Sequence, residues 1–134
     1  MRSRLTTITA GILIALLAAG ALAAGLDVQH SSVDGVTVTV TPQNISREAK
    51  SWEFKIVLET HSTDLSDDLT KSAALIDEKG MRYVPTGWEG AGPGGHHRAG
   101  VLRFKPISPQ PQAIELRITR TGEAVPRSFK WQLK

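Results

Sequence analysis

The amino-acid sequence predicts an all-β fold, and three observations support this expectation. From about residue 25 onward, apolar and polar residues alternate one by one in several short stretches, as in strands that bury one face. Turn-forming glycine, proline and aspartate residues separate these stretches. No stretch has the period of an amphipathic helix. The sequence therefore predicts a single small β domain.

The beginning of the chain predicts export. Two arginines within the first four residues precede an apolar stretch that closes on small residues at alternating positions. This organisation is that of a signal peptide over residues 1–24, followed by a mature domain over residues 25–134, with cleavage after Ala23 or Ala24. The apolar stretch is also just long enough to cross a bilayer, so an uncleaved membrane anchor is the alternative. We expect a periplasmic or extracellular (secreted) protein, membrane-anchored only if the leader is retained.

The composition limits how the mature domain is stabilised and what it binds. The chain has no cysteine, so in an oxidising compartment packing alone must hold the domain together. Two of the 16 basic side chains lie in the leader, which leaves 14 against 13 acidic ones. A nearly neutral domain with 5% aromatic residues, and no interleaving of basic and aromatic side chains, is not expected to bind nucleic acid.

The first expected elements are a hairpin and a central strand. Residues 26–31 alternate, Asp34-Gly35 supplies a turn that tolerates positive φ, and valines then alternate with threonines up to Pro42. The strongest strand signal follows at residues 52–58, where large apolar residues point one way and charged residues the other. The apolar residues are Trp52, Phe54, Ile56 and Leu58. We expect this strand to be central.

The middle of the chain predicts a crossover and a second hairpin. Residues 62–72 lack alternation and indicate a crossover with about one helical turn, capped by Asp64 or Asp67. The turn at residues 77–80 then separates two short apolar stretches, which predicts the hairpin. Residues 85–99, which hold five glycines and two prolines, predict a long loop.

Three further strands complete the expected fold. They lie at residues 101–104, 114–118 and 128–133. Many short strands, turns between them and one longer connection fit a single immunoglobulin-like Greek-key β-sandwich of about seven or eight strands. The apolar phase of the alternating strands predicts the core residues Phe54, Ile56, Leu116, Ile118 and Trp131.

The glycine-rich loop ends in adjacent histidines, which suggest a metal site. Neutral imidazole binds copper and zinc, and His61 and Asp64 follow the expected central strand at the same rim as His96 and His97. Adjacent residues of a regular strand point to opposite faces, but the glycines free the backbone to turn both imidazoles toward one ion. The alternative is that the histidines support the loops through hydrogen bonds to backbone carbonyls.

Two other residues of this loop suggest a protein partner instead. Trp88 is the tryptophan placed for exposure, and Arg98 adds a charge beside it. Aromatic and arginine side chains on a flexible loop are typical anchors of protein–protein contacts. A protein of the cell envelope is therefore the alternative partner to a metal ion. Arg98 also weighs against the metal, because a fixed cation repels it unless Asp64 offsets the charge.

Several other kinds of site are not expected. The glycine-rich loop lacks the lysine and the following helix that a phosphate site requires. The acidic cluster of Glu59, Asp64, Asp67 and Asp68 lacks the glycine and terminal glutamate of an EF-hand, and a solvated connection is the preferred interpretation. The chain has neither a G-x-S-x-G nucleophile elbow nor a cysteine nucleophile, so we do not expect an enzyme.

Three segments also resemble a group of small exported bacterial proteins of uncharacterised function. The resemblance rests on the sequence from Thr60 to Leu69, on Trp88-x-Gly90, and on the sequence from Gly94 to Leu102. It covers roughly the middle third of the chain. It implies an envelope setting and a pairing of the His61 segment with the His96-His97 segment, and it brings no known activity, cofactor or catalytic residue.

Overall fold

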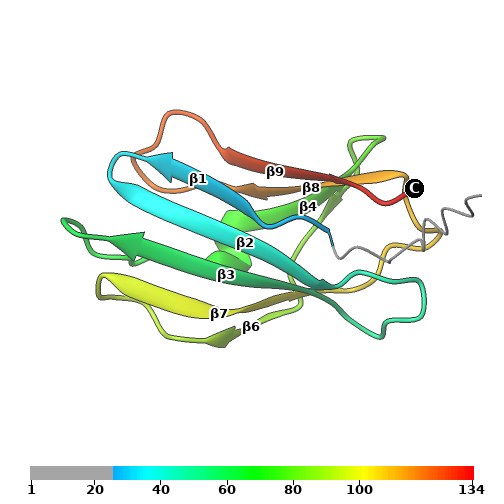
Figure 1. Ribbon diagram of the computed structural model, residues 1–134, viewed down its shortest axis with the longest axis horizontal. Helices are drawn as coiled ribbons and strands as arrows, with labels where there is room; N and C mark the ends of the chain where they lie inside the picture. The colour runs from blue at the N-terminus through cyan, green and yellow to red at the C-terminus, as the bar shows by residue number, and fades with distance from the viewer. Residues whose placement is uncertain (1–25) are drawn as a thin grey trace, which may run out of the picture.

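The fold consists of two antiparallel β-sheets packed face to face (Figure 1). The computed structural model describes residues 26–134, and the expected signal peptide with its cleavage site lies outside them. The elements are β1 (Gln29–Val33), β2 (Val36–Asn44), β3 (Trp52–Thr60), α1 (Leu69–Ser72), β4 (Ala73–Asp77), β5 (Arg82–Tyr83), β6 (Gly87–Gly90), β7 (His97–Phe104), β8 (Ala113–Ile118) and β9 (Arg127–Gln132). The strand orders are β1-β2-β3-β7-β6 and β5-β4-β8-β9. The expected all-β sandwich is confirmed. Within the described residues, no helix has the length and apolar character needed to cross a membrane.

The predicted hairpin at the start of the domain is confirmed. Asp34 and Gly35 have φ values of 50° and 76°, the paired positive values of a two-residue hairpin turn between β1 and β2. At its other end β1 reaches the second sheet, because the Gln29 side-chain amide donates to the Lys130 carbonyl and accepts from the Lys130 N–H. This edge strand therefore closes one open side of the sandwich.

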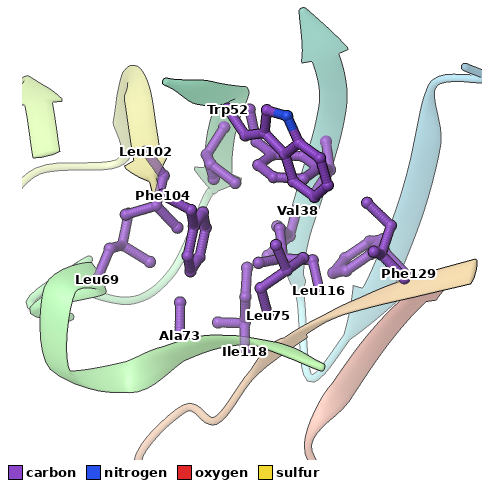
Figure 2. Close-up of a cluster of buried hydrophobic side chains, with 14 of the residues drawn as sticks. Val38, Trp52, Leu69, Ala73, Leu75, Leu102, Phe104, Leu116, Ile118 and Phe129 are labelled. Carbon is purple, nitrogen blue, oxygen red and sulfur yellow. The ribbon is translucent and has the colours of Figure 1, made fainter. Parts of the chain in front are cut away.

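The strand predicted to be central is central. β3 lies between β2 and β7, and its alternate residues Trp52, Phe54, Ile56 and Leu58 are fully buried. They share one core cluster with side chains from the second sheet and from α1, and Figure 2 shows Trp52 of this strand in that cluster together with Leu69, Leu75, Leu116 and Phe129. The five predicted core residues are all buried. Phe54 forms an edge-to-face contact with Phe104, with ring centroids 5.8 Å apart.

Two predictions about the connections were wrong in detail. The helical turn begins after Asp68, which accepts hydrogen bonds from the backbone N–H and hydroxyl of Thr70, so neither Asp64 nor Asp67 is the cap. The segment expected as a long loop contains β6 and the start of β7. A Cβ at Gly90 would lie 2.4 Å from Gly100 Cα, so this glycine permits close strand pairing rather than loop freedom.

Four connections gather at one end of the sandwich, which we call the loop end (Figure 1). They are the β1–β2 turn at residues 34–35, the crossover at residues 61–68, the β6–β7 loop at residues 91–96 and the β8–β9 loop at residues 119–126. The C terminus lies at the opposite end (Figure 1). The loop end therefore brings together both segments that the sequence suggested as functional.

Candidate functional site

The histidines of the two segments border one depression at the loop end. It has a volume of about 470 Å³, and we call it the His corner. Its walls are Gly35, Thr37, Glu59, Thr60, His61, His96 and His97. The sequence predicted that His61, His96 and His97 share a rim, and they do.

The strand register explains why Glu59 belongs to this group. Glu59 of β3 lies directly opposite His97 of β7, and paired residues of adjacent strands project from the same face. His97 Nε2 is 3.7 Å from Glu59 Oε1, and both side chains are exposed. His61 follows two residues after Glu59, and the backbone N–H of Thr60 donates to the His96 carbonyl at 3.0 Å. The backbone thus already holds the segments of all three histidines against one another.

Asp64, the fourth residue predicted as a metal ligand, has a different role. Its Oδ1 accepts a hydrogen bond of 2.7 Å from the Gly95 N–H. Beside it, Leu65 N–H donates to the Gly95 carbonyl, and Gly94 N–H donates to the Leu65 carbonyl. Gly94 and Gly95 have φ values of 113° and 78°, which allow this exchange. Asp64 therefore fastens the β6–β7 loop to the crossover and does not border the His corner.

Arg98, predicted to contact a partner, is buried with 2% of its surface exposed. Its Nη1 donates to the carbonyls of Leu65 and Asp67, and its Nη2 donates to the carbonyl of Ala91. The physical reason is the alternation of side chains along a strand. Arg98 lies four residues before the core residue Leu102, so both side chains point to the inner face. The side chain ties the crossover to the β6–β7 loop and is not available to a partner.

Trp88 is likewise part of the packing. It lies in β6 and is half buried against the core, with its indole N–H donating to the Ala91 carbonyl at 3.0 Å. A Cβ at Gly100 would lie 2.5 Å from Trp88 Cζ2, so the indole lies directly over that glycine. The Arg98 guanidinium carbon is 5.8 Å from the ring centroid, within cation–π range. Trp88 is therefore only partly exposed, and it lies in a strand rather than in a loop.

The sequence interpretation missed a buried ionic network at the same end. Arg127 donates to the carbonyls of Ser31, Val33 and Val36, and to both carboxylate oxygens of Glu123. These contacts use all five N–H groups of the guanidinium. Arg127 occupies the inward phase of β9, two residues before Phe129, and that position was the available signal.

A second arginine extends this network to the crossover. Arg120 binds the Asp67 carboxylate in a bidentate manner at 2.9 and 3.0 Å and also donates to Glu123. The hydrogen bonds from Arg127 lower the pKa of Glu123, against the opposing effect of desolvation. The hydrogen bonds to Asp67 raise the pKa of Arg120. The network therefore links the β1–β2 turn, the β8–β9 loop and the crossover into one rigid unit.

The polar side chains of the loop end fall into two groups. Asp64, Asp68, Arg98 and Arg127 hold connections in place, whereas His61, His96 and His97 make no side-chain hydrogen bond within residues 26–134. No group of three or more histidine, aspartate or glutamate side chains in that range stands in a preformed metal-binding arrangement.

No protein-family model, curated protein or solved structure matches the chain.

Proposed function

We propose that the chain is an exported, non-enzymatic binding module that binds a divalent transition metal, copper or zinc, at the His corner. The observation that carries the proposal is the gathering of three exposed imidazoles and the Glu59 carboxylate around one depression. Asp64, which the sequence suggested as a ligand, is replaced in this role by Glu59 because its oxygen is held by Gly95.

The chemistry of these groups suits such an ion. Imidazole nitrogen and carboxylate oxygen bind zinc at about 2.0–2.2 Å, and imidazole is also a common ligand of copper. The separation of 3.7 Å between His97 Nε2 and Glu59 Oε1 leaves room for small rotations of both exposed side chains onto an ion between them. The hydrogen bond from the Thr60 N–H to the His96 carbonyl holds these two backbone segments together. The imidazoles of His61 and His96 can therefore turn toward the same ion.

An immunoglobulin-like topology belongs to the same proposal. Immunoglobulin sandwiches have strand orders ABED and, with the extra strand C′, C′CFG. The orders β2-β3-β7-β6 and β5-β4-β8-β9 correspond to these strand by strand, with β1 added beside the first. This correspondence makes the connections of the loop end the B–C, D–E and F–G loops. Variable domains carry the B–C and F–G loops of their binding site at that end.

Export is the remaining part of the proposal. The apolar leader over residues 1–24 supports a signal peptide and a periplasmic or extracellular location, with membrane anchoring if the leader is retained. The envelope-protein alternative, built on Trp88 and Arg98, is weakened because Arg98 is buried and Trp88 is half buried against the core. A protein partner would have to use residues other than Arg98.

Calorimetric titration of tag-free protein with copper and zinc tests the metal proposal. We expect one ion per chain, with at least a tenfold loss of affinity in His61→Ala and His97→Ala. His30→Ala is the matched control, because His30 is exposed on β1 and does not border the His corner. Affinity should also weaken when the solution is acidified, because ligation requires neutral imidazole. Binding weaker than about millimolar, or equal losses in the His30 variant, would contradict the proposal.

A further inference from the structure

We infer that the loop end carries a second binding surface, a docking site for a polypeptide segment that presents an apolar side chain next to a basic one. We call it the valine surface. Its apolar residues are Val33, Ala124, Val125 and Pro126. This inference is independent of the metal proposal.

The apolar character of this surface is unusual for loop tips. Val33 at the end of β1 is 40% exposed, and Val125 in the β8–β9 loop is 72% exposed. Both border one depression of about 420 Å³, although Val33 belongs to the five-stranded sheet and Val125 to a loop between two strands of the other sheet. A contiguous exposed apolar patch rimmed by polar residues is typical of an interaction site.

The patch is held rigidly in its exposed position. Arg127 donates to the Val33 carbonyl at 3.0 Å and to the Val36 carbonyl at 2.8 Å, which fixes the turn beside Val33. The same guanidinium donates two hydrogen bonds to the carboxylate of Glu123, which lies two residues before Val125. Arg127 therefore holds the chain on both sides of the valine surface. A preorganised surface loses little conformational entropy when a partner binds.

The neighbouring charges define the occupant. Asp34 and Glu123 border both the valine surface and an adjacent polar pocket of about 660 Å³. Arg120 and Arg127 neutralise the carboxylates of Asp67 and Glu123. Lys71, which also lines the pocket, lies 4.0 Å from Asp68, and this leaves Asp34 and Asp64 without a salt bridge within residues 26–134. The remaining negative charge complements a basic side chain one or two positions from the apolar residue that covers Val125.

The test uses a blocked hexapeptide of alternating leucine and arginine, added to isotope-labelled, metal-free protein and followed by amide chemical shifts. We expect saturable shifts centred on residues 31–36 and 122–128. Val125→Ser should weaken binding at least fivefold. Val84→Ser is the matched control, because Val84 is equally exposed at 72% but does not border either depression, and its affinity should change less than twofold.

Two control peptides separate the contributions. A leucine–glutamate peptide should not bind, and a serine–arginine peptide should bind at least fivefold more weakly. Shifts centred elsewhere, equal losses in the two valine variants, or equal binding of any two peptides would overturn the inference. His97→Ala should leave peptide binding unchanged, so failure of the metal proposal and failure of this one are distinguishable.

Discussion

Replacing Arg127 by methionine should destabilise the domain strongly. Methionine keeps the length of the side chain but removes five hydrogen bonds. The carbonyls of Ser31, Val33 and Val36 would lose the hydrogen bonds from Arg127, and Glu123 would keep only its bond from Arg120. Removing one partner of a buried ion pair costs about 3–5 kcal/mol. The expected loss is therefore a large share of the roughly 5–15 kcal/mol of a typical domain.

Urea denaturation of the wild type and the variant measures this loss. Arg117→Met is the matched control, because Arg117 pairs with Glu115 on the outer face and its side chain is 38% exposed. Exposed pairs contribute about 0–1 kcal/mol, so the control should change little. Arg127→Lys should fall between the two, because it keeps the charge and loses the planar fork. A loss below about 1 kcal/mol for Arg127→Met, or one equal to the control, would refute the reasoning.

Three further predictions concern the core, a strand contact and acid stability. Ile56→Ala should cost about 2–5 kcal/mol in denaturant melts, because the side chain is fully buried, and a loss under about 0.5 kcal/mol would mean that the faces of β3 are misassigned. Gly100→Ala should displace the Trp88 indole and cost about 1–3 kcal/mol, with a changed near-ultraviolet circular dichroism spectrum; an unchanged spectrum would contradict the contact. Because folding lowers the pKa of Glu123, its contribution is present above about pH 4.3 and is lost as the pH falls through the lower value of the folded state. Glu123→Gln should flatten that acid loss in pH-dependent melts, and an unchanged slope would contradict it.

The sheet framework could be predicted because the alternation of apolar residues is strong. In β3, four large apolar residues on one phase leave a single choice of buried face. The Asp34-Gly35 turn was equally predictable, because few residue pairs adopt two successive positive φ values. In both places the local chemistry and the tertiary contacts favour the same structure.

The buried arginines could not be recognised from composition alone. Arg98 is the second residue of β7 and Arg127 the first of β9, and at a strand's beginning the alternation is weak, so a charged residue there suggests a loop. Their partners are mostly backbone carbonyls of distant connections, and such partners leave no mark on the sequence. The alternation does place them correctly when it is extended: Arg127 lies two residues before Phe129, and Arg98 lies four residues before Leu102, so both side chains belong to the inner face.

The candidate site was predictable in part for the same reason. The glycines and adjacent histidines indicated an irregular rim, and the structure brings His61, His96 and His97 to one depression. The choice of carboxylate depends on cross-strand register, which pairs Glu59 with His97, and on a loop hydrogen bond that removes Asp64. Register between strands that lie far apart in the chain is set by the whole sheet, so residue spacing could not supply it.

The most direct test of the central claim is anomalous diffraction at the zinc edge from crystals of tag-free protein soaked in zinc. The account predicts one strong peak per chain at the His corner, within bonding distance of His97 and at least two of the groups His61, His96 and Glu59. The peak should vanish in His97→Ala crystals grown and soaked in the same way. No peak at millimolar zinc, or a peak only at His30 or another surface histidine, would contradict it.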